Sequence, residues 1–196
     1  MQPNRYFLVH KPINMVSQFV SSHEVPLLGS LDFEFPEGSH AIGRLDKQSE
    51  GLLLITTNSK VTNLLFHGKQ PHTRTYLVQV INIISEETIA TLANGIAISA
   101  PQGTQYMTTP CIVKSVEKPA YIQEARKDLH ENVQNSWLTI TLTEGKFHQV
   151  RKMMAAVKHK CLRLIRIAIE DIELENLPPG EVIEVSEEYF FEKLRL

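Results

Sequence analysis

The feature that most constrains this fold is a short apolar run that directly follows a charged loop. Residues Leu52 to Ile55 are uninterrupted hydrophobic residues between Gly51 and Asn58. A run of this length, bounded by turn-forming residues, is typical of a β-strand covered on both faces. The preceding residues 43–50, GRLDKQSE, are rich in charge and begin with a glycine, which predicts a loop.

This loop carries Asp46, a carboxylate close to the start of the buried strand. Loops that a rigid strand holds in place are common positions for nucleophiles and acid/base groups. An ordinary polar turn before a strand would contain the same residue types. The loop alone therefore leaves both interpretations open.

Periodicity predicts both strands and helices along the rest of the chain. Alternation and β-branching predict strands at residues 6–10, 75–80, 137–142 and 162–167, with further antiparallel strands between 96 and 118. Capping residues predict helices after Asn58 or Ser59, after Ser85, from about Phe147, and after Ser186. Residues 119–135 are polar and predict an extended hairpin loop or a short helix.

The bulk composition predicts a soluble cytoplasmic protein. A chain of 196 residues with 42% hydrophobic content can form one good-sized domain or two tightly packed halves. Its two cysteines, Cys111 and Cys161, are too few for a disulfide scaffold and fit no metal motif. No apolar run approaches the length of a membrane span, so we expect no membrane partner.

Charge is distributed unevenly, although the net charge is only -2. Between residues 144 and 166 the basic residues are Lys146, Arg151, Lys152, Lys158, Lys160, Arg163 and Arg166, with Glu144 as the only acid. From residue 170 to 192 all the charged residues are acids. A basic segment in a near-neutral protein indicates a local anion-binding surface, and two solvated faces of opposite sign are the alternative.

Three segments together resemble one enzyme family. Residues 43–58, GRLDKQSEGLLLITTN, resemble the signature of the pseudouridine synthases of the RsuA/RluB/RluE family, which modify ribosomal RNA. The strand at 74–80 and residues 144–153, EGKFHQVRKM, resemble later family segments in the expected order. The family pattern at 144–153 is EGRNRQVRRM, from which Lys146, Phe147, His148 and Lys152 depart. The resemblance extends from about residue 5 to 185 and is closest to the E-type, large-subunit branch.

The resemblance implies a set of site residues. Asp46 would be the catalytic carboxylate, acting as nucleophile or base at the sugar, with Arg151 as its positive partner and Tyr76 against the target base. Leu164 would pack under that base, and Arg44 would fill the gap it leaves or hold phosphate. Lys146, Lys152 and Arg163 would bind the RNA backbone. Lys11, after the first strand, matches a Lys-Pro opening near the active-site cleft in the family, which implies contact with RNA; a surface lysine is the alternative and is the preferred interpretation.

The resemblance also implies the fold and the domain organisation. We expect an α+β fold in which a mixed, mainly antiparallel sheet is flanked by helices, with two halves around a central cleft. The whole chain, 1–196, would be a single catalytic domain, with an N-terminal half of about 1–70 and a C-terminal half of 71–196. The small S4 RNA-binding domain of many relatives is not expected.

The implied activity is isomerisation of a specific uridine in RNA, most similar to the enzymes acting on 23S ribosomal RNA. The reaction moves the bond at C1′ from N1 to C5 of uracil without gain of atoms or redox change, so no cofactor or metal is expected. We expect a cytoplasmic monomer with RNA as its partner.

Four other functions compete with this hypothesis. A glycosidase would need two carboxylates about 5–9.5 Å apart, for which Asp46 and Glu50 are the only nearby pair. A metal enzyme would need ligand spacing that the eight histidines lack. A non-catalytic RNA-binding protein would share the basic segment without needing Asp46, and a synthase directed at transfer RNA would share the whole site.

Overall fold

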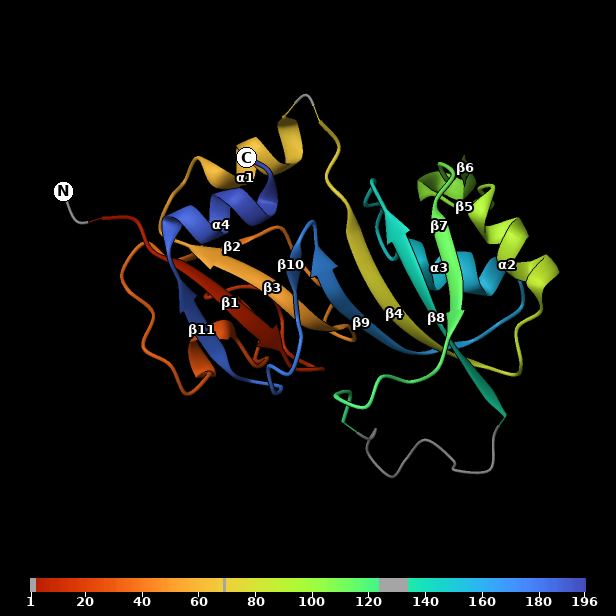
Figure 1. Ribbon diagram of the computed structural model, residues 1–196, viewed down its shortest axis with the longest axis horizontal. Coiled ribbons are helices and arrows are strands. Elements are labelled where there is room, and N and C mark those ends of the chain that lie inside the picture. Colours follow the sequence, from red (N-terminus) through yellow and green to blue (C-terminus); the bar gives the residue numbers. More distant parts are fainter. Residues whose placement is uncertain (1–2, 69, 124–133) are drawn as a thin grey trace. The chain divides into compact units, whose positions relative to one another are not determined.

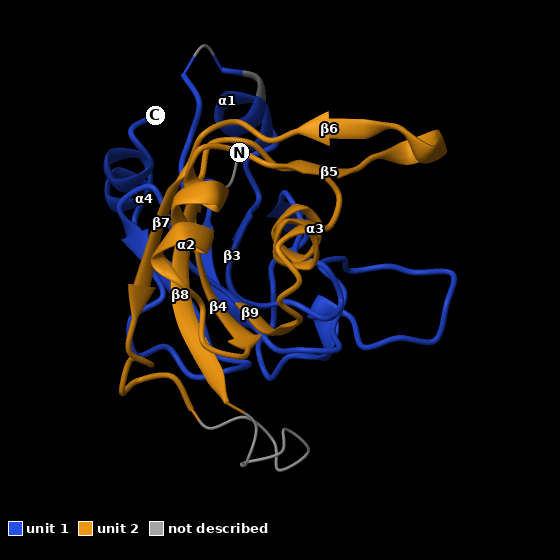
Figure 2. Cartoon of the chain, turned by 90° about the vertical axis from the view of Figure 1, so that its right-hand side faces the viewer, with its two compact units in different colours: residues 1–74, 165–196 blue, residues 75–164 orange. Residues whose placement is uncertain are grey.

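The chain folds into two compact units, which are described separately (Figures 1 and 2). The computed structural model describes residues 3–68, 70–123 and 134–196. Unit 1 contains residues 1–74 and 165–196, and unit 2 contains residues 75–164. The chain passes between the units twice, within strand β4 (Arg74–Ile81) and within strand β9 (Cys161–Ile169).

Unit 1 is built on strand pairs formed by both ends of the chain. Its elements are β1 (Tyr6–Lys11), a 3-10 helix (Leu28–Ser30), β2 (His40–Ile42), β3 (Glu50–Thr56), α1 (Val61–His67), the second half of β9, β10 (Ile172–Glu173), β11 (Val182–Val185) and α4 (Glu187–Leu194). Strand β1 pairs antiparallel with both β3 and β11, and β2 pairs antiparallel with β3. Strand β3 also pairs with β9, in parallel, so the sheet is mixed.

The core of unit 1 lies on both faces of β1 and β3. On one face, Phe7 and Val9 of β1 join Leu53 and Ile55 of β3, with Phe33 among the aromatic rings of the loop that covers them. On the other face, α4 packs on β1, where the rings of Tyr6 and Phe190 are 4.7 Å apart. Every residue of β3 is buried, which confirms the prediction of a strand covered on both faces.

Unit 2 consists of strands with two helices packed on them. Its elements are the rest of β4, α2 (Glu86–Ala93), β5 (Ala97–Ser99), a 3-10 helix (Pro101–Gly103), β6 (Gln105–Met107), β7 (Ile112–Val116), β8 (Asn135–Leu142), α3 (Gln149–Ala156) and the start of β9. Strand β8 lies between β4 and β7, while β5 and β6 form a separate two-stranded sheet.

Helices α2 and α3 contribute to the same hydrophobic core as the strands of unit 2. The core joins Leu92 of α2 and Met153 of α3 to Val78 of β4 and to Leu138 and Ile140 of β8. The alternation predicted for 137–142 is confirmed, because Leu138, Ile140 and Leu142 are buried while the residues between them are only half-buried.

The α+β class and the mixed, mainly antiparallel sheet are confirmed, but two boundaries differ from the expectations. Residues 165–196 belong to the same unit as the first 74 residues, because β11 pairs with β1 and the end of β9 pairs with β3. Helix α3 begins at Gln149, not Phe147, because His148 has a left-handed backbone with φ of 55°. Most of the loop expected at 119–135 lies outside the described residues.

None of the helices in the described ranges is long and apolar enough to cross a membrane.

Candidate active site

In unit 1, the loop that carries Asp46 is fixed by a buried serine. The Ser17 hydroxyl accepts a hydrogen bond from the Leu45 N–H and donates one to the Leu45 carbonyl, both at 3.0 Å. The Asp46 carbonyl accepts from the Ser49 N–H at 2.9 Å, which closes a tight turn. Because the peptide units on either side of Asp46 are held by hydrogen bonds, the half-buried carboxylate projects from a rigid loop.

Gly51, the second residue of β3 after this loop, is a position that strongly favours glycine. Its backbone has a φ of +106°, and a Cβ there would lie 2.4 Å from the carbonyl oxygen of Arg166. Gly51 is paired with Arg166 in the parallel β3–β9 ladder. The missing side chain therefore allows β9 to approach the end of the Asp46 loop.

Lys11, which was expected at the surface, is fully buried in unit 1. Its ammonium group donates hydrogen bonds to the carbonyls of Pro12 at 2.8 Å and Met15 at 2.7 Å. Burial lowers the pKa of Lys11 to about 8, while the negative charges of Glu50 and Asp46 raise it and the positive charge of Arg166 lowers it. A cation close to Asp46 is thus supplied within unit 1 by a residue for which the sequence had favoured a surface position.

Arg166 is a second buried cation in this unit, with 3% of its surface exposed. Its Nε donates to the Leu52 carbonyl at 2.7 Å, on the strand that follows the Asp46 loop. Glu50, at the start of that strand, is also buried. Arg166 therefore does not belong to the solvent-facing basic surface in which the charge pattern had included it, whereas Arg44 is exposed.

In unit 2, Tyr76 and Leu164 contribute to one hydrophobic cluster. Leu164 is buried in it, and the half-buried Tyr76 ring packs against it from β4. Strands β4 and β9 are neighbours in the sheet, which explains why two residues far apart in sequence join the same cluster. A tyrosine and a leucine placed in this way are compatible with holding a planar base.

Arg151 projects from the first turn of α3 and is half-buried. One terminal guanidinium nitrogen donates to the Cys161 sulfur at 3.7 Å. Burial raises the pKa of Cys161 to about 11, and the positive charge of Arg151 only partly offsets it. Cys161 therefore remains a neutral thiol near pH 7, and its contact with Arg151 is a hydrogen bond and not an ion pair.

The segment before α3 is organised around Glu144 and Gln149. Burial opposes ionisation of Glu144, but hydrogen bonds from Tyr106, Thr109 and Gln149 outweigh it and lower the pKa of the carboxyl group. The Gln149 side chain also accepts from the Lys146 N–H at 2.8 Å. Glu144 is thus an ionised internal anchor, although it is the only acid in this basic segment.

The predicted backbone-binding residues fall into two groups within unit 2. The Lys146 ammonium lies 4.6 Å from the centre of the Tyr106 ring, and the Lys152 ammonium donates to the Ser99 carbonyl at 2.8 Å. Arg163 is elsewhere, since its guanidinium donates to the Gln123 carbonyl at 2.9 Å and lies 5.9 Å from the Trp137 ring centre. Lys146 and Lys152 therefore both contact the β5–β6 sheet, Lys146 at Tyr106 of β6 and Lys152 at Ser99 of β5.

The predicted site residues are divided between the units. Asp46 and Arg44 belong to unit 1, and the other members belong to unit 2, namely Tyr76, Arg151, Leu164, Lys146, Lys152 and Arg163. Their joint action stays a prediction.

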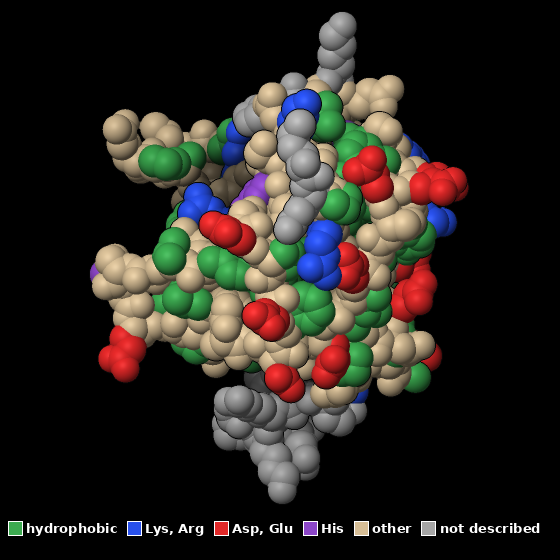
Figure 3. All heavy atoms as spheres, turned by 90° about the vertical axis from the view of Figure 1, so that its left-hand side faces the viewer, with side chains coloured by type: hydrophobic (Ala, Val, Ile, Leu, Met, Phe, Trp, Pro, Cys, Tyr) green, Lys and Arg blue, Asp and Glu red, His purple; other side chains and the backbone are tan. Residues whose placement is uncertain are grey.

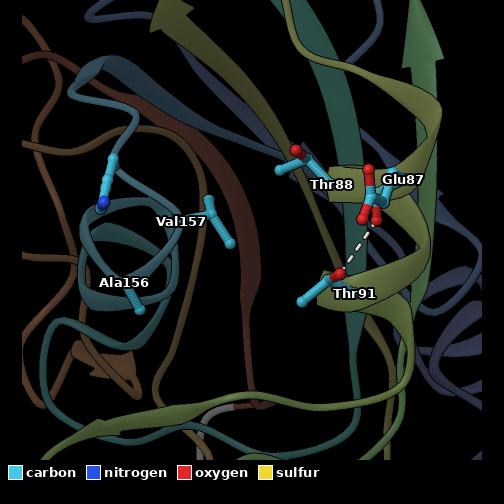
Figure 4. A pocket seen from close by; sticks show the side chains of 6 residues that line it. Glu87, Thr88, Thr91, Ala156 and Val157 are labelled. Atoms are coloured by element: carbon cyan, nitrogen blue, oxygen red, sulfur yellow. Dashed lines mark hydrogen bonds between the residues drawn. The ribbon is translucent and has the colours of Figure 1, made fainter.

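A hollow on unit 2 contains none of these residues. It lies between α2 and the end of α3 (Figure 4), and it is lined by Glu87, Thr88, Thr91, Ala156, Val157 and Lys158. The Thr91 hydroxyl donates to the Glu87 carbonyl within α2, so part of the polar lining is already paired. The hollow offers no group that the implied chemistry needs.

Sequence reasoning missed Ser17, the buried position of Lys11 and that of Arg166. A signal for Lys11 was present, because it continues a strand whose other residues are almost all apolar and is followed by Pro12. No sequence periodicity indicates that Ser17 holds the Asp46 loop, because its hydrogen-bond partner Leu45 is 28 residues away.

Known proteins resemble this chain in sequence. The sequence model of the RNA pseudouridylate synthase family matches residues 5–156. The ribosomal large subunit pseudouridine synthase E of Xanthomonas axonopodis pv. citri is 32% identical, covering 88% of this chain and 89% of that protein. The protein of the same name from Vibrio parahaemolyticus is 30% identical, covering 94% and 75%.

The fold matches as well. A crystal structure of a pseudouridylate synthase superposes with a TM-score of 0.77 and 28% identity, covering 99% of this chain and 75% of that one. The charged loop before a fully buried strand, the family match over most of the chain and the shared fold lead to one conclusion. The chain belongs to the RNA pseudouridylate synthase family.

Proposed function

We propose that this chain converts one uridine of large-subunit ribosomal RNA to pseudouridine and that Asp46 is the catalytic carboxylate. The observation that carries the proposal is the rigid presentation of Asp46, with the adjacent peptide held by the Ser17 hydroxyl. The choice of large-subunit RNA is supported by the relatives named large subunit synthase E, which align with most of this chain.

The chemistry requires a carboxylate and no redox partner. The bond between C1′ and N1 breaks, the uracil turns, and a bond between C1′ and C5 forms; C5 loses its proton and N1 gains one, so no atoms are gained or lost. Asp46 acts at the sugar as nucleophile or as base, two routes that use the same position. Lys11 supplies positive charge within unit 1, close enough to Asp46 and Glu50 for their charges to act on it.

The other residues have roles at the base and at the phosphates. Tyr76 and Leu164 hold the uracil while it turns, and Tyr76 moves the proton at C5. Arg151 supports the charge of Asp46. Extruding the target base from folded RNA costs a few kcal/mol, and Arg44, which is exposed, fills the gap or binds phosphate.

Lys146, Lys152 and Arg163 bind the RNA backbone in this proposal. We further propose that the enzyme acts as a cytoplasmic monomer and needs neither a cofactor nor a metal.

The test is a pseudouridine map of ribosomal and transfer RNA from cells with and without the protein, with rescue by wild type, Asp46→Asn or Asp32→Asn. Asp32 is an exposed aspartate of unit 1 and serves as the matched control. We expect one large-subunit uridine to lose its modification and to regain it with wild type and Asp32→Asn, but not with Asp46→Asn.

The rival functions give different maps. Restoration by Asp46→Asn would contradict the catalytic role of Asp46. An unchanged map, with RNA binding retained in vitro, would favour the non-catalytic RNA-binding protein. A change confined to transfer RNA would keep the chemistry and overturn the proposed substrate.

A further inference from the structure

Phe147 is an aromatic residue in an unusual position. It is 73% exposed, although it lies between the charged Lys146 and helix α3. Its ring is stacked on the His148 imidazole, with centres 3.9 Å apart and planes 18° apart. A ring so exposed leaves most of its apolar surface available to a ligand, and covering that surface would be favourable.

The backbone around Phe147 is held in place. The Gln149 side chain accepts from the Lys146 N–H and donates to the Glu144 carboxylate at 2.7 Å. His148 has a left-handed backbone, which turns the chain immediately before the helix. The aromatic pair is therefore presented by a fixed turn and not by a loose loop.

Positive charge surrounds the pair. The Lys152 ammonium lies 5.5 Å from the centre of the Phe147 ring, and Lys146 lies over Tyr106 of β6, which is bonded to the same Glu144. Glu144 itself accepts hydrogen bonds from three donors, so its carboxylate oxygens are engaged within this segment. Exposed aromatic rings flanked by lysines match single-stranded nucleic acid, whose bases stack while its phosphates bind cations.

We propose that Phe147, stacked on His148, is a platform for one unpaired nucleobase of the RNA substrate, with Lys146 and Lys152 binding the adjoining phosphates. The inference rests on the proposed RNA substrate and deepens it by assigning a base-stacking position outside the catalytic residues. Phe147 and His148 are also two of the positions at which this chain departs from the family pattern EGRNRQVRRM.

The test separates stacking from charge by using two fluorescein-labelled probes. One is a 12-nucleotide oligouridylate, and the other is an abasic ribose-phosphate chain of equal length, which has the phosphates but no bases. Association constants are measured by anisotropy for the full-length wild type and for Phe147→Ala, Phe147→Leu and Phe147→Trp. Ile83→Ala is the matched control, since Ile83 is an apolar residue of unit 2 that is 66% exposed.

We expect Phe147→Ala and Phe147→Leu to weaken oligouridylate binding between roughly 5-fold and 150-fold, the range found for base–aromatic stacks. Phe147→Trp and Ile83→Ala should stay close to wild type, and binding of the abasic chain should be unchanged in all four. The salt dependence of binding should also be unaltered, because no phosphate contact is removed. Because the Phe147 side chain is mostly in solvent, thermal midpoints should be preserved.

Equal oligouridylate affinity in Phe147→Ala and wild type would overturn the inference, and so would an equal loss on the abasic chain. A parallel assay of pseudouridine formation by the wild type on unmodified ribosomal RNA separates the two proposals. No product there would contradict the proposed function, while a selective loss on oligouridylate would still support the platform.

Discussion

At Lys11, a charged side chain occupies a position that is closed to solvent. Its two hydrogen bonds go to the carbonyls of Pro12 and Met15, and Glu50 and Asp46 supply negative charge. Burying an ammonium group is costly unless it is paired, and the cost appears here as a pKa near 8. This residue therefore links the pH to the stability of the unit that carries Asp46.

Lys11→Met should remove a specific part of the pH dependence of stability. The folded pKa of about 8 lies below the ordinary value of 10.5, so the unfolded chain holds this proton to higher pH than the folded protein does. The wild type should therefore gain stability relative to Lys11→Met between pH 8 and 10.5. If the whole difference between the two pKa values is expressed, the free energy of unfolding of the wild type rises by about 3 kcal/mol relative to the variant.

Urea unfolding at pH 7, 8, 9 and 10.5 checks this expectation, with Lys114→Met as an exposed-lysine control. The difference between wild type and Lys11→Met should rise over this range, while the control difference stays flat. A difference that falls with pH would mean that the folded protein raises the pKa of Lys11.

At the scale of elements, the parallel pairing of β3 with β9 holds the end of the Asp46 loop in unit 1. In this pairing Glu50 lies opposite Ile165 and Gly51 lies opposite Arg166. It brings the buried Arg166 guanidinium to the Leu52 carbonyl at 2.7 Å. The element that follows Asp46 is thus fixed by a strand more than 100 residues later in the chain.

Gly51→Ala should break this pairing, whereas Gly38→Ala should not. Both glycines have a positive φ, +106° and +83°, but the added Cβ meets the Arg166 backbone only at Gly51, and nothing lies within 4 Å at Gly38. Gly38→Ala should cost about 1–3 kcal/mol from backbone strain, and Gly51→Ala should cost clearly more. Urea unfolding measures both, and equal losses would show that strain alone, not the close approach of β9, makes Gly51 necessary.

At the scale of the whole molecule, charge is segregated along the chain and the total is -2. The acids of residues 170–192 belong to unit 1, where most of them are exposed, and Figure 3 shows Asp and Glu side chains scattered over one face. The basic residues from Lys146 to Arg163 belong to unit 2. Overall charge does not attract RNA, so binding must depend on local cations.

Replacing Lys146 and Lys152 together by glutamine should reduce the salt dependence of RNA binding. Each phosphate contact to a single strand contributes about 0.7 to the slope of log K against log salt, so two lost contacts should lower it by about 1.4. Lys60→Gln with Lys114→Gln changes the net charge equally at exposed positions and should leave the slope unchanged. If the two double variants gave equal slopes of log K against log salt, RNA binding would depend on the overall charge and not on Lys146 and Lys152.

The sequence by itself determined the local features of this protein. The apolar run after the charged loop predicted β3, and the capping serines placed α2 and α4, where Ser85 and Ser186 accept from the Thr88 and Tyr189 N–H groups. These predictions succeeded because strand burial and helix caps depend on neighbouring residues. The signature around Asp46 likewise indicated the family, which the comparisons confirmed.

The tertiary structure alone decided which distant segments meet. It placed residues 165–196 in the unit of β1 and β3, joined Ser17 to Leu45, and buried Lys11 and Arg166. Hydrophobic periodicity reports which face of an element is covered but carries no information about its partner. The environment of a charged side chain depends on that partner, and for this reason two cations interpreted as surface residues lie inside the protein.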